Sequence, residues 1–195
     1  MKVVLDACVL YPSVLREIVM GVAERGGFQP VWSARILGEW QRAAQKLGDA
    51  GALIASGEIA RLRAQWPEAE IPADLAVEHR LWLPDPADAH VLATAICAQA
   101  DRIITLNLKD FPARAVCAEG LRAQSPDDFL MELWLHAPEI VSDAVREAQS
   151  ATEAASGRAQ PLRPLLKRAK LPRLGKALEH DDQTNSPPPL AAPKA

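Results

Sequence analysis

The sequence is poor in cysteine and has no long apolar run. Its three cysteines are an odd number without Cys-x-x-Cys spacing, which argues against a disulfide framework and a zinc ribbon, so we expect reduced thiols that are not nucleophiles. No apolar run approaches the roughly 18 residues that a membrane span needs. The opening Met-Lys-Val-Val-Leu-Asp also lacks the apolar stretch of a signal peptide. We therefore expect a cytoplasmic protein without a membrane partner.

Charge of one sign is not in large excess. The chain holds 25 acidic and 22 basic residues, a formal net charge of −3. How these charges are distributed matters more for nucleic-acid binding than their sum. A basic stretch interleaved with leucines lies near the C-terminus, and its members are Arg163, Lys167, Arg168, Lys170, Arg173 and Lys176. The small net charge therefore does not exclude a nucleic-acid partner.

Strand and helix patterns alternate from residue 1 to about residue 135. The expected strands are residues 2–5, 28–32, 102–106 and, weakly, a part of 116–123. The expected helices run from Val14 to the stop at Gly26, after Ser33, in pieces over residues 53–83, after Asp88 and after Ser125. Such alternation is typical of a parallel sheet with helices on both faces. The pattern predicts a three-layer α/β/α fold.

The C-terminal third of the chain differs in composition. We expect residues 1–135 to form the α/β domain and residues 136–179 to form a helical, partly basic and exposed appendage. Residues 180–195 contain Pro187-Pro188-Pro189 among small and polar residues. Such a segment buries too little apolar area to offset its ordering entropy, so we expect a disordered tail.

Four acidic residues stand where a parallel α/β sheet places its ligand site. Asp6 ends the first strand, and Asp110 follows residues 102–106 by a short turn. Asp88 begins the helix before that strand, and Glu39 lies on the helix after the second strand. Ligands of such sheets bind beyond the carboxyl ends of the strands, so these acids can border one crevice.

Clustered carboxylates repel each other unless a cation neutralises them. Oxygen ligands without paired His or Cys favour Mg²⁺ or Mn²⁺ over zinc. Each acid alone also has a structural interpretation, as a strand end for Asp6, a helix start for Asp88 and a surface residue for Glu39. Spacing does not separate Asp85 from Asp88, although we favour Asp88. His90 is given no role, because positions i and i+2 of a helix do not share a face.

Three longer segments are similar to one known family. They read VVLDACVLYP with Asp6, SARILGEW with Glu39, and DPADAHVLATAICAQADRIITLNLKDFP, and a final SPDDFL also fits. In this order, over roughly residues 1–135, they resemble the PIN-domain family, in particular the bacterial group related to the toxins of toxin-antitoxin modules. The third segment is much more specific than any single acid.

The resemblance implies a compact Rossmann-like α/β/α domain that cleaves single-stranded RNA with a divalent metal, Mg²⁺ or Mn²⁺. It also implies frequent dimerisation, hence a homodimer, and a possible antitoxin partner. The roles that it implies are metal ligation by Asp6, Glu39 and Asp88, assistance by Asp110, and a site floor shaped by Thr105 and Asn107. Family members often carry Asp at the position of Asn107, so the fourth site residue is either Asn107 or Asp110.

Other functions remain open at this stage. A phosphatase of the haloacid dehalogenase type needs a second acid two residues after the first, where Cys8 stands. A response-regulator receiver needs more acids at that strand end. A catalytically silent PIN-like module that binds RNA or protein is the alternative of a different class, and the presence of all four acids argues against it. We expect Lys109, Arg114 and the basic stretch to contact phosphates, whereas the stretch could also dock a partner or a second subunit.

Overall fold

A parallel sheet forms the centre of the molecule. The computed structural model describes residues 1–185. Within them the strands β1 (Lys2–Leu5), β2 (Gln29–Val31), β3 (Arg102–Ile104) and β4 (Arg122–Gln124) form one sheet in the order β2-β1-β3-β4, with every neighbouring pair parallel. Residues 3–5 of the central β1 are fully buried. Burial on both faces explains why this strand reads as a continuous apolar run.

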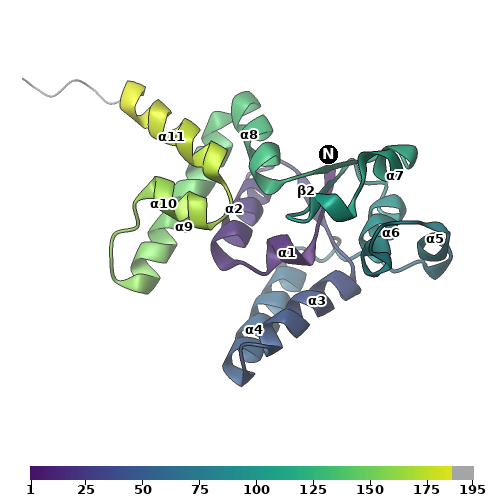
Figure 1. Cartoon of the computed structure of the whole chain (residues 1–195). Coiled ribbons are helices and arrows are strands. Elements are labelled where there is room, and N and C mark those ends of the chain that lie inside the picture. Colours follow the sequence, from purple (N-terminus) through teal and green to yellow (C-terminus); the bar gives the residue numbers. More distant parts are fainter. Residues whose placement is uncertain (186–195) are drawn as a thin grey trace, which may run out of the picture.

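Helices cover both faces of this sheet, which confirms the α/β/α fold. The helical elements are α1 (Ala7–Leu10), α2 (Ser13–Glu24), α3 (Ala34–Gln45), α4 (Asp49–Gln65), α5 (Leu75–Arg80), η1 (Pro86–Asp88), α6 (Ala89–Cys97), η2 (Leu108–Asp110), α7 (Ala113–Ala118), α8 (Pro126–His136), α9 (Pro138–Ser156), α10 (Leu162–Arg168) and α11 (Pro172–Asn185). In Figure 1, α2, α8 and α9 lie to one side of the strands, and α5, α6 and α7 lie to the other. None of the helices within residues 1–185 is long and apolar enough to cross a membrane.

The predicted helix starts and stops are confirmed where local chemistry decides them. Ser33 caps α3 by accepting a hydrogen bond from the Ile36 backbone N–H at 3.4 Å. Ser125 caps α8 in the same way, through the Asp128 N–H at 3.1 Å, with Pro126 as first helical residue. Gly26, at φ +80°, follows α2, in a backbone conformation that glycine adopts without strain.

Two segments differ from the prediction because tertiary contacts decide them. The weak strand expected in a part of 116–123 is present as β4, but it starts only at Arg122, after the end of α7, and extends to Gln124. The four-residue helix α1 was not predicted. The carbonyls of Leu10 and Tyr11, at its C-terminal end, accept hydrogen bonds from the Arg16 guanidinium at 2.7 and 3.3 Å. A helix this short is not stable by its own hydrogen bonds, so its sequence carries no periodic signal.

Arg16 also connects the helices below the sheet. Its guanidinium carbon lies 4.6 Å from the centre of the Trp40 ring on α3, and Nη2 lies 3.4 Å from Oε2 of Glu58 on α4. Burial lowers the pKa of the guanidinium, because the interior disfavours its charge, whereas Glu58 opposes this effect. The α3–α4 hairpin is thereby held against α1 and α2.

The appendage is helical as predicted, but it is not exposed. Val141, Ala144 and Val145 of α9 are at most 1% exposed and belong to the same core as the strand residues. The helix packs closely on α2, where a Cβ built on Gly21 would lie 3.2 Å from the Ala144 Cβ. The core therefore continues across residue 136, and the division between residues 1–135 and 136–179 stays a prediction.

The helices α10 and α11 form a hairpin with one buried side. Its leucines 165, 166, 171, 174 and 178 are buried. A Cβ on Gly175 would lie 3.2 Å from the Leu166 Cβ, so glycine allows the two helices to approach closely. Because α11 continues to Asn185, the expected disorder from residue 180 is corrected for residues 180–185. The rest of the expected tail, residues 186–195, lies outside the described residues.

Asp127, at the start of α8, anchors this hairpin to the domain. Its carboxylate accepts hydrogen bonds from the backbone N–H groups of Arg173 at 2.9 Å and Leu174 at 3.0 Å. These donors belong to the first turn of α11, which has no intrahelical acceptor for them. Asp127 is 7% exposed, so water does not readily replace it as the acceptor.

We expect Asp127→Ala to lower the free energy of unfolding by about 1 to 3 kcal/mol, because it leaves two helix N–H groups without an acceptor. Urea unfolding followed by circular dichroism measures the change. Asp143→Ala, which removes an exposed partner of Arg146, is the matched control and should change stability by less than about 0.5 kcal/mol. Equal effects of the two substitutions would show that Asp127 does not anchor α11.

Candidate active site

Asp6 is fixed at the carboxyl end of β1. Its backbone N–H donates to the Ile104 carbonyl at 3.1 Å, which extends the pairing with β3 by one residue. Oδ2 accepts hydrogen bonds from Thr105 Oγ1 at 2.6 Å and from Cys8 Sγ at 3.1 Å. Although Asp6 occupies the N-cap position of α1, its side chain makes no cap hydrogen bond. Asp6 is 6% exposed, so its orientation is set by side chains of the candidate site.

Cys8 supports Asp6 as a neutral donor. Burial and, after it, the charge of the nearby Asp6 carboxylate raise the pKa of the Cys8 thiol to about 12. Its sulfur also accepts a hydrogen bond from the Leu106 N–H at 3.2 Å. The thiol therefore stays protonated at neutral pH, which agrees with the expectation that no cysteine is a nucleophile.

Asp88 is the residue whose carboxyl is affected by the charges of the other predicted site acids. It follows the end of β2 by a long connection and forms the N-cap of α6. Burial and, after it, the charges of Asp6, Asp85, Asp110 and Glu39 together raise the pKa of its carboxyl to about 6. Three acids from three other segments, which the sequence predicted as parts of one site with Asp88, thus lie within electrostatic reach of it.

Asp85 and Asp88 have different environments. Asp85 is exposed, and its Oδ1 accepts the Ala87 N–H at 2.9 Å, so it caps η1. Asp88 is half-buried and makes no side-chain cap hydrogen bond. Asp85 therefore fits the interpretation as a residue that caps a helix start. Of the two, Asp88 remains our predicted metal ligand.

Glu39 points from α3 toward the start of α6. Its side chain is 28% exposed, and Oε1 lies 2.8 Å from His90 Nε2. Two arginines of its own helix lie farther away, with Arg35 Nε at 3.9 Å and Arg42 Nη2 at 3.7 Å. Glu39 is thus held at the interface of two helices and is not a free surface acid.

No role was predicted for His90, and the structure places its ring in contact with Glu39. Its side chain is 4% exposed, and the contact with Glu39 is short but not aligned as a hydrogen bond. Neither ring nitrogen has a hydrogen-bond partner among the described residues. This contact is with Glu39 on α3 and not with Asp88, so it arises between two helices and not from spacing along one helix. Only the contact between α3 and α6 reveals His90.

The turn after β3 supplies the other predicted residues. Thr105 is fully buried and accepts a hydrogen bond from the Asn107 N–H at 3.0 Å while it donates to Asp6. Asn107 is exposed, whereas Asp110 is half-buried and its charge reaches Asp88. These positions favour Asp110 as the fourth site residue, an assignment that stays a prediction.

Basic side chains border this turn. Lys109 on η2 and Arg114 on α7 are exposed, and neither forms an ion pair within the described part of the chain. They are therefore available to phosphate groups near Asp110.

The donor chemistry of the acids fits a hard divalent cation. Carboxylate oxygens are the ligands that Mg²⁺ and Mn²⁺ prefer, and the mutual repulsion that raises the Asp88 pKa is the kind that a cation relieves. Among residues 1–185, no three His, Cys, Asp or Glu side chains converge closely enough to hold a metal ion. Ligation would therefore require rotation of these side chains.

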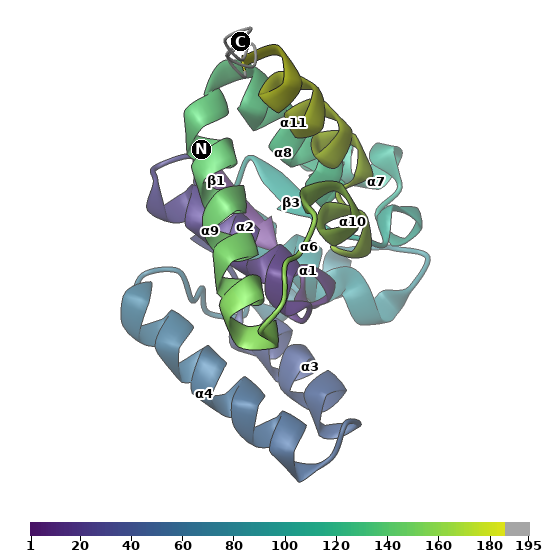
Figure 2. The same ribbon diagram turned by 90° about the vertical axis from the view of Figure 1, so that its left-hand side faces the viewer.

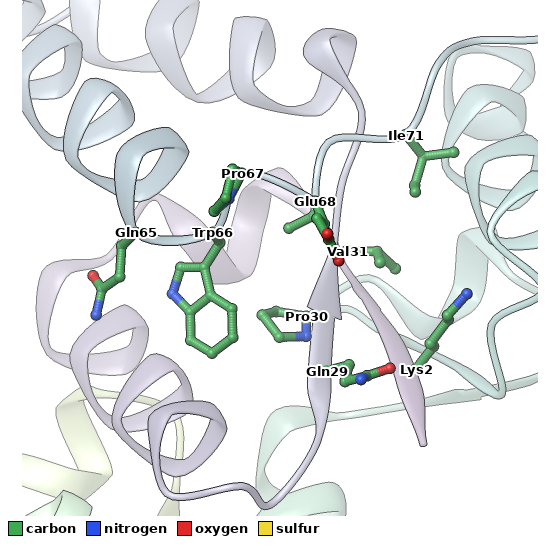
Figure 3. A pocket seen from close by; sticks show the side chains of 10 residues that line it. Lys2, Gln29, Pro30, Val31, Gln65, Trp66, Pro67, Glu68 and Ile71 are labelled. Carbon is green, nitrogen blue, oxygen red and sulfur yellow. The ribbon is translucent and has the colours of Figure 1, made fainter.

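A separate cavity of about 330 Å³ lies along the outer edge of β2 (Figure 3). Lys2 and Gln29, the first residues of β1 and β2, line it together with residues 65–69 and Ile71. None of the predicted site acids lines this cavity. It runs along β2 from Gln29 to Val31 and is not part of the acidic site.

Comparisons with known proteins point to one family. A family model described as "PIN domain" matches residues 2–109, more than half of the chain. A protein of Mycobacterium tuberculosis named "Putative ribonuclease VapC50" is 47% identical over 45 residues, which are 23% of this chain and 27% of that protein. The chain thus matches about a quarter of that relative's length. No solved structure matches.

We expect Asp88→Asn to stabilise the metal-free protein at neutral pH. The folded-state pKa of about 6 lies above the ordinary value of 3.8, so ionised Asp88 destabilises the fold. The gain should be on the order of 1 kcal/mol at pH 7, because solvent screens part of the repulsion at this partly exposed group. It should shrink as the pH falls from 6 to 4, where the wild-type carboxyl takes up its proton.

Thermal unfolding in chelator at several pH values tests this expectation. Asp49→Asn, a change at an exposed acid of α4, should shift the melting temperature similarly across the range. A gain from Asp88→Asn that does not depend on pH would contradict the electrostatic explanation.

Proposed function

We propose that this chain, which belongs to the PIN-domain family, is a divalent-metal-dependent endoribonuclease that cleaves single-stranded RNA. The observation that carries the proposal is the convergence of charge on Asp88 from Asp6, Glu39 and Asp110. Carboxylates gathered in this way repel each other and destabilise the fold, and a bound cation would relieve that repulsion. Groups perturbed in this way cluster at functional sites. The short match to a protein named as a ribonuclease supports the same activity.

We further propose that the protein is of the toxin type. This rests on the resemblance of its motifs and on the name of the partial relative. An antitoxin protein, a second copy of the chain in a homodimer, and a location in the cytoplasm are parts of this proposal.

In the proposed site, Asp6, Glu39 and Asp88 hold Mg²⁺ or Mn²⁺. When bound, such an ion supplies Lewis-acid chemistry for water attack on a phosphodiester. Thr105 and Cys8 keep the Asp6 carboxylate in place through their hydrogen bonds to Oδ2. Preorganised ligands of this kind lower the cost of reaching the reactive geometry.

The remaining residues act on protons and phosphates. Asp110 assists cleavage, either directly or through a water molecule. Lys109 and Arg114 bind phosphates that flank the scissile bond. Because the pKa of Asp88 is raised to about 6, this carboxyl is mostly ionised at neutral pH but takes up a proton in acid, where the proton would compete with the cation. Cleavage is therefore expected to weaken below pH 6.

The test is cleavage of a mixed set of labelled single-stranded RNAs with Mg²⁺ or Mn²⁺. We expect Asp6→Asn and Asp88→Asn to reduce the cleavage rate at least about 100-fold, because each removes a charged ligand, and chelator to stop cleavage of the wild-type chain. Circular dichroism verifies that the variants fold. Lys46→Gln, which removes an exposed charge at the end of α3, should cleave at the wild-type rate. Full activity of either Asp variant would refute the site, and failure to cut any RNA would favour the non-catalytic binding module.

We also expect His90 to position Glu39, since the two lie in contact and the imidazole has no other partner among the described residues. His90→Ala should weaken Mn²⁺ binding about 10- to 100-fold, as loss of a group that orients a metal ligand commonly does. His90→Gln, which keeps a donor near Glu39, should restore part of the affinity. Isothermal titration measures both.

Melting temperatures in chelator separate this role from packing. A purely structural role of His90 predicts a lower melting temperature for His90→Ala with an unchanged Mn²⁺ affinity in the folded protein, and that result would exclude the positioning role.

A further inference from the structure

Positive charge is concentrated in one C-terminal segment. Residues 154–178 contain seven of the 22 basic residues and no acidic residue. The rest of the chain keeps 15 basic residues against 25 acidic ones, a net charge of −10. The candidate active site lies in that acidic remainder. A polyanionic substrate is therefore repelled by the net negative charge of the part of the chain that holds the site, and it is attracted by the positive charge of this segment.

The fold turns these basic residues outward. The leucines of the α10–α11 hairpin are buried, whereas Arg163, Lys167, Arg168, Lys170, Arg173 and Lys176 are all exposed. The interleaved sequence thus encodes an amphipathic hairpin, apolar toward α8 and α9 and basic toward solvent. We call these six exposed residues the basic face.

Part of the basic face lacks acidic partners within the protein. Arg163 pairs with Glu179 at 3.0 Å, and Arg173 pairs with Asp128. Lys167, Lys170 and Lys176, by contrast, form no ion pair with any residue of the described part of the chain. Surface lysines that lie close together without acidic partners favour the binding of an anionic ligand.

The basic face begins at the same edge of the sheet as the active site. Arg173 and Leu174 bind Asp127, which follows the carboxyl end of β4, as Asp6 follows β1. Because β4 is two strands away from β1 in the sheet, their ends are about 10 Å apart. Figure 2 shows α11 beside α8, on the side of the molecule away from α4.

We propose that the basic face binds the phosphate backbone of the RNA and holds the strand across the carboxyl edge of the sheet. This inference rests on the proposed function, since it assigns the face to the substrate of that site. Flexible lysines contact phosphates without reading bases, so the face contributes affinity and position but no sequence preference. Each phosphate contact on single-stranded RNA releases bound counterions, which makes the binding weaken with salt.

The experiment measures the affinity of the full chain for a labelled single-stranded RNA by fluorescence anisotropy. Chelator and the Asp88→Asn background prevent cleavage. Lys167→Gln combined with Lys170→Gln should raise the Kd about tenfold or more at 0.1 M salt, and should reduce the slope of log K against log salt by about 1.4, since each lost contact accounts for about 0.7. The matched control combines Lys46→Gln with Arg61→Gln, which removes two exposed charges from α3 and α4.

Each result decides the proposal. Loss of affinity and of salt dependence in the hairpin variant alone supports it. Equal Kd values for the hairpin variant and the control would overturn it. Poly-glutamate that competes as strongly as RNA of equal charge would also overturn it, because the face would then suit an acidic protein partner.

Failure of the proposed function has a different signature. If the wild-type chain binds RNA through the basic face but cuts none with Mg²⁺ or Mn²⁺, the binding inference stands and the nuclease activity falls. If the wild-type chain cuts RNA and the hairpin variant binds as tightly as the control, the nuclease activity stands and the binding inference falls.

Discussion

The parallel pairing of β1 with β2 on one side and β3 on the other constrains where every site residue lies. Parallel strands present their carboxyl ends at one edge, so Asp6 and the turn that carries Thr105 meet without any loop having to reach across the sheet. The long connection between β2 and β3 reaches that edge where α6 begins, which brings Asp88 within electrostatic reach of Asp6.

This arrangement stores electrostatic repulsion in the fold. The same burial and neighbouring charge that raise the Asp88 pKa destabilise the protein at neutral pH. The surrounding contacts offset part of that cost, since Asp6 receives two hydrogen bonds and Glu39 lies against His90. The site is thus held together by packing and hydrogen bonds in spite of its charges, as is common at functional sites.

The C-terminal helices contribute more than an appendage would. The helix α9 completes the core over α2, and Asp127 ties α11 to the edge of the sheet. The family match covers residues 2–109, and these helices follow it in the chain. They place positive charge next to an acidic domain. The proposed chemistry needs carboxylates, whereas the proposed substrate is a polyanion that carboxylates repel, so it is favourable to hold the two kinds of charge on different parts of the chain.

The sequence alone determined the three-layer fold, the approximate positions of the first three strands and the acids near their carboxyl ends, because alternating apolar runs, serine caps and glycine stops act over a few neighbouring residues. Only the tertiary structure separated Asp88 from Asp85, placed His90 against Glu39 and buried the apolar face of α9. Each of these depends on contacts between elements far apart in the chain. Local spacing carries no information about such contacts, which are decided by how the packed helices meet.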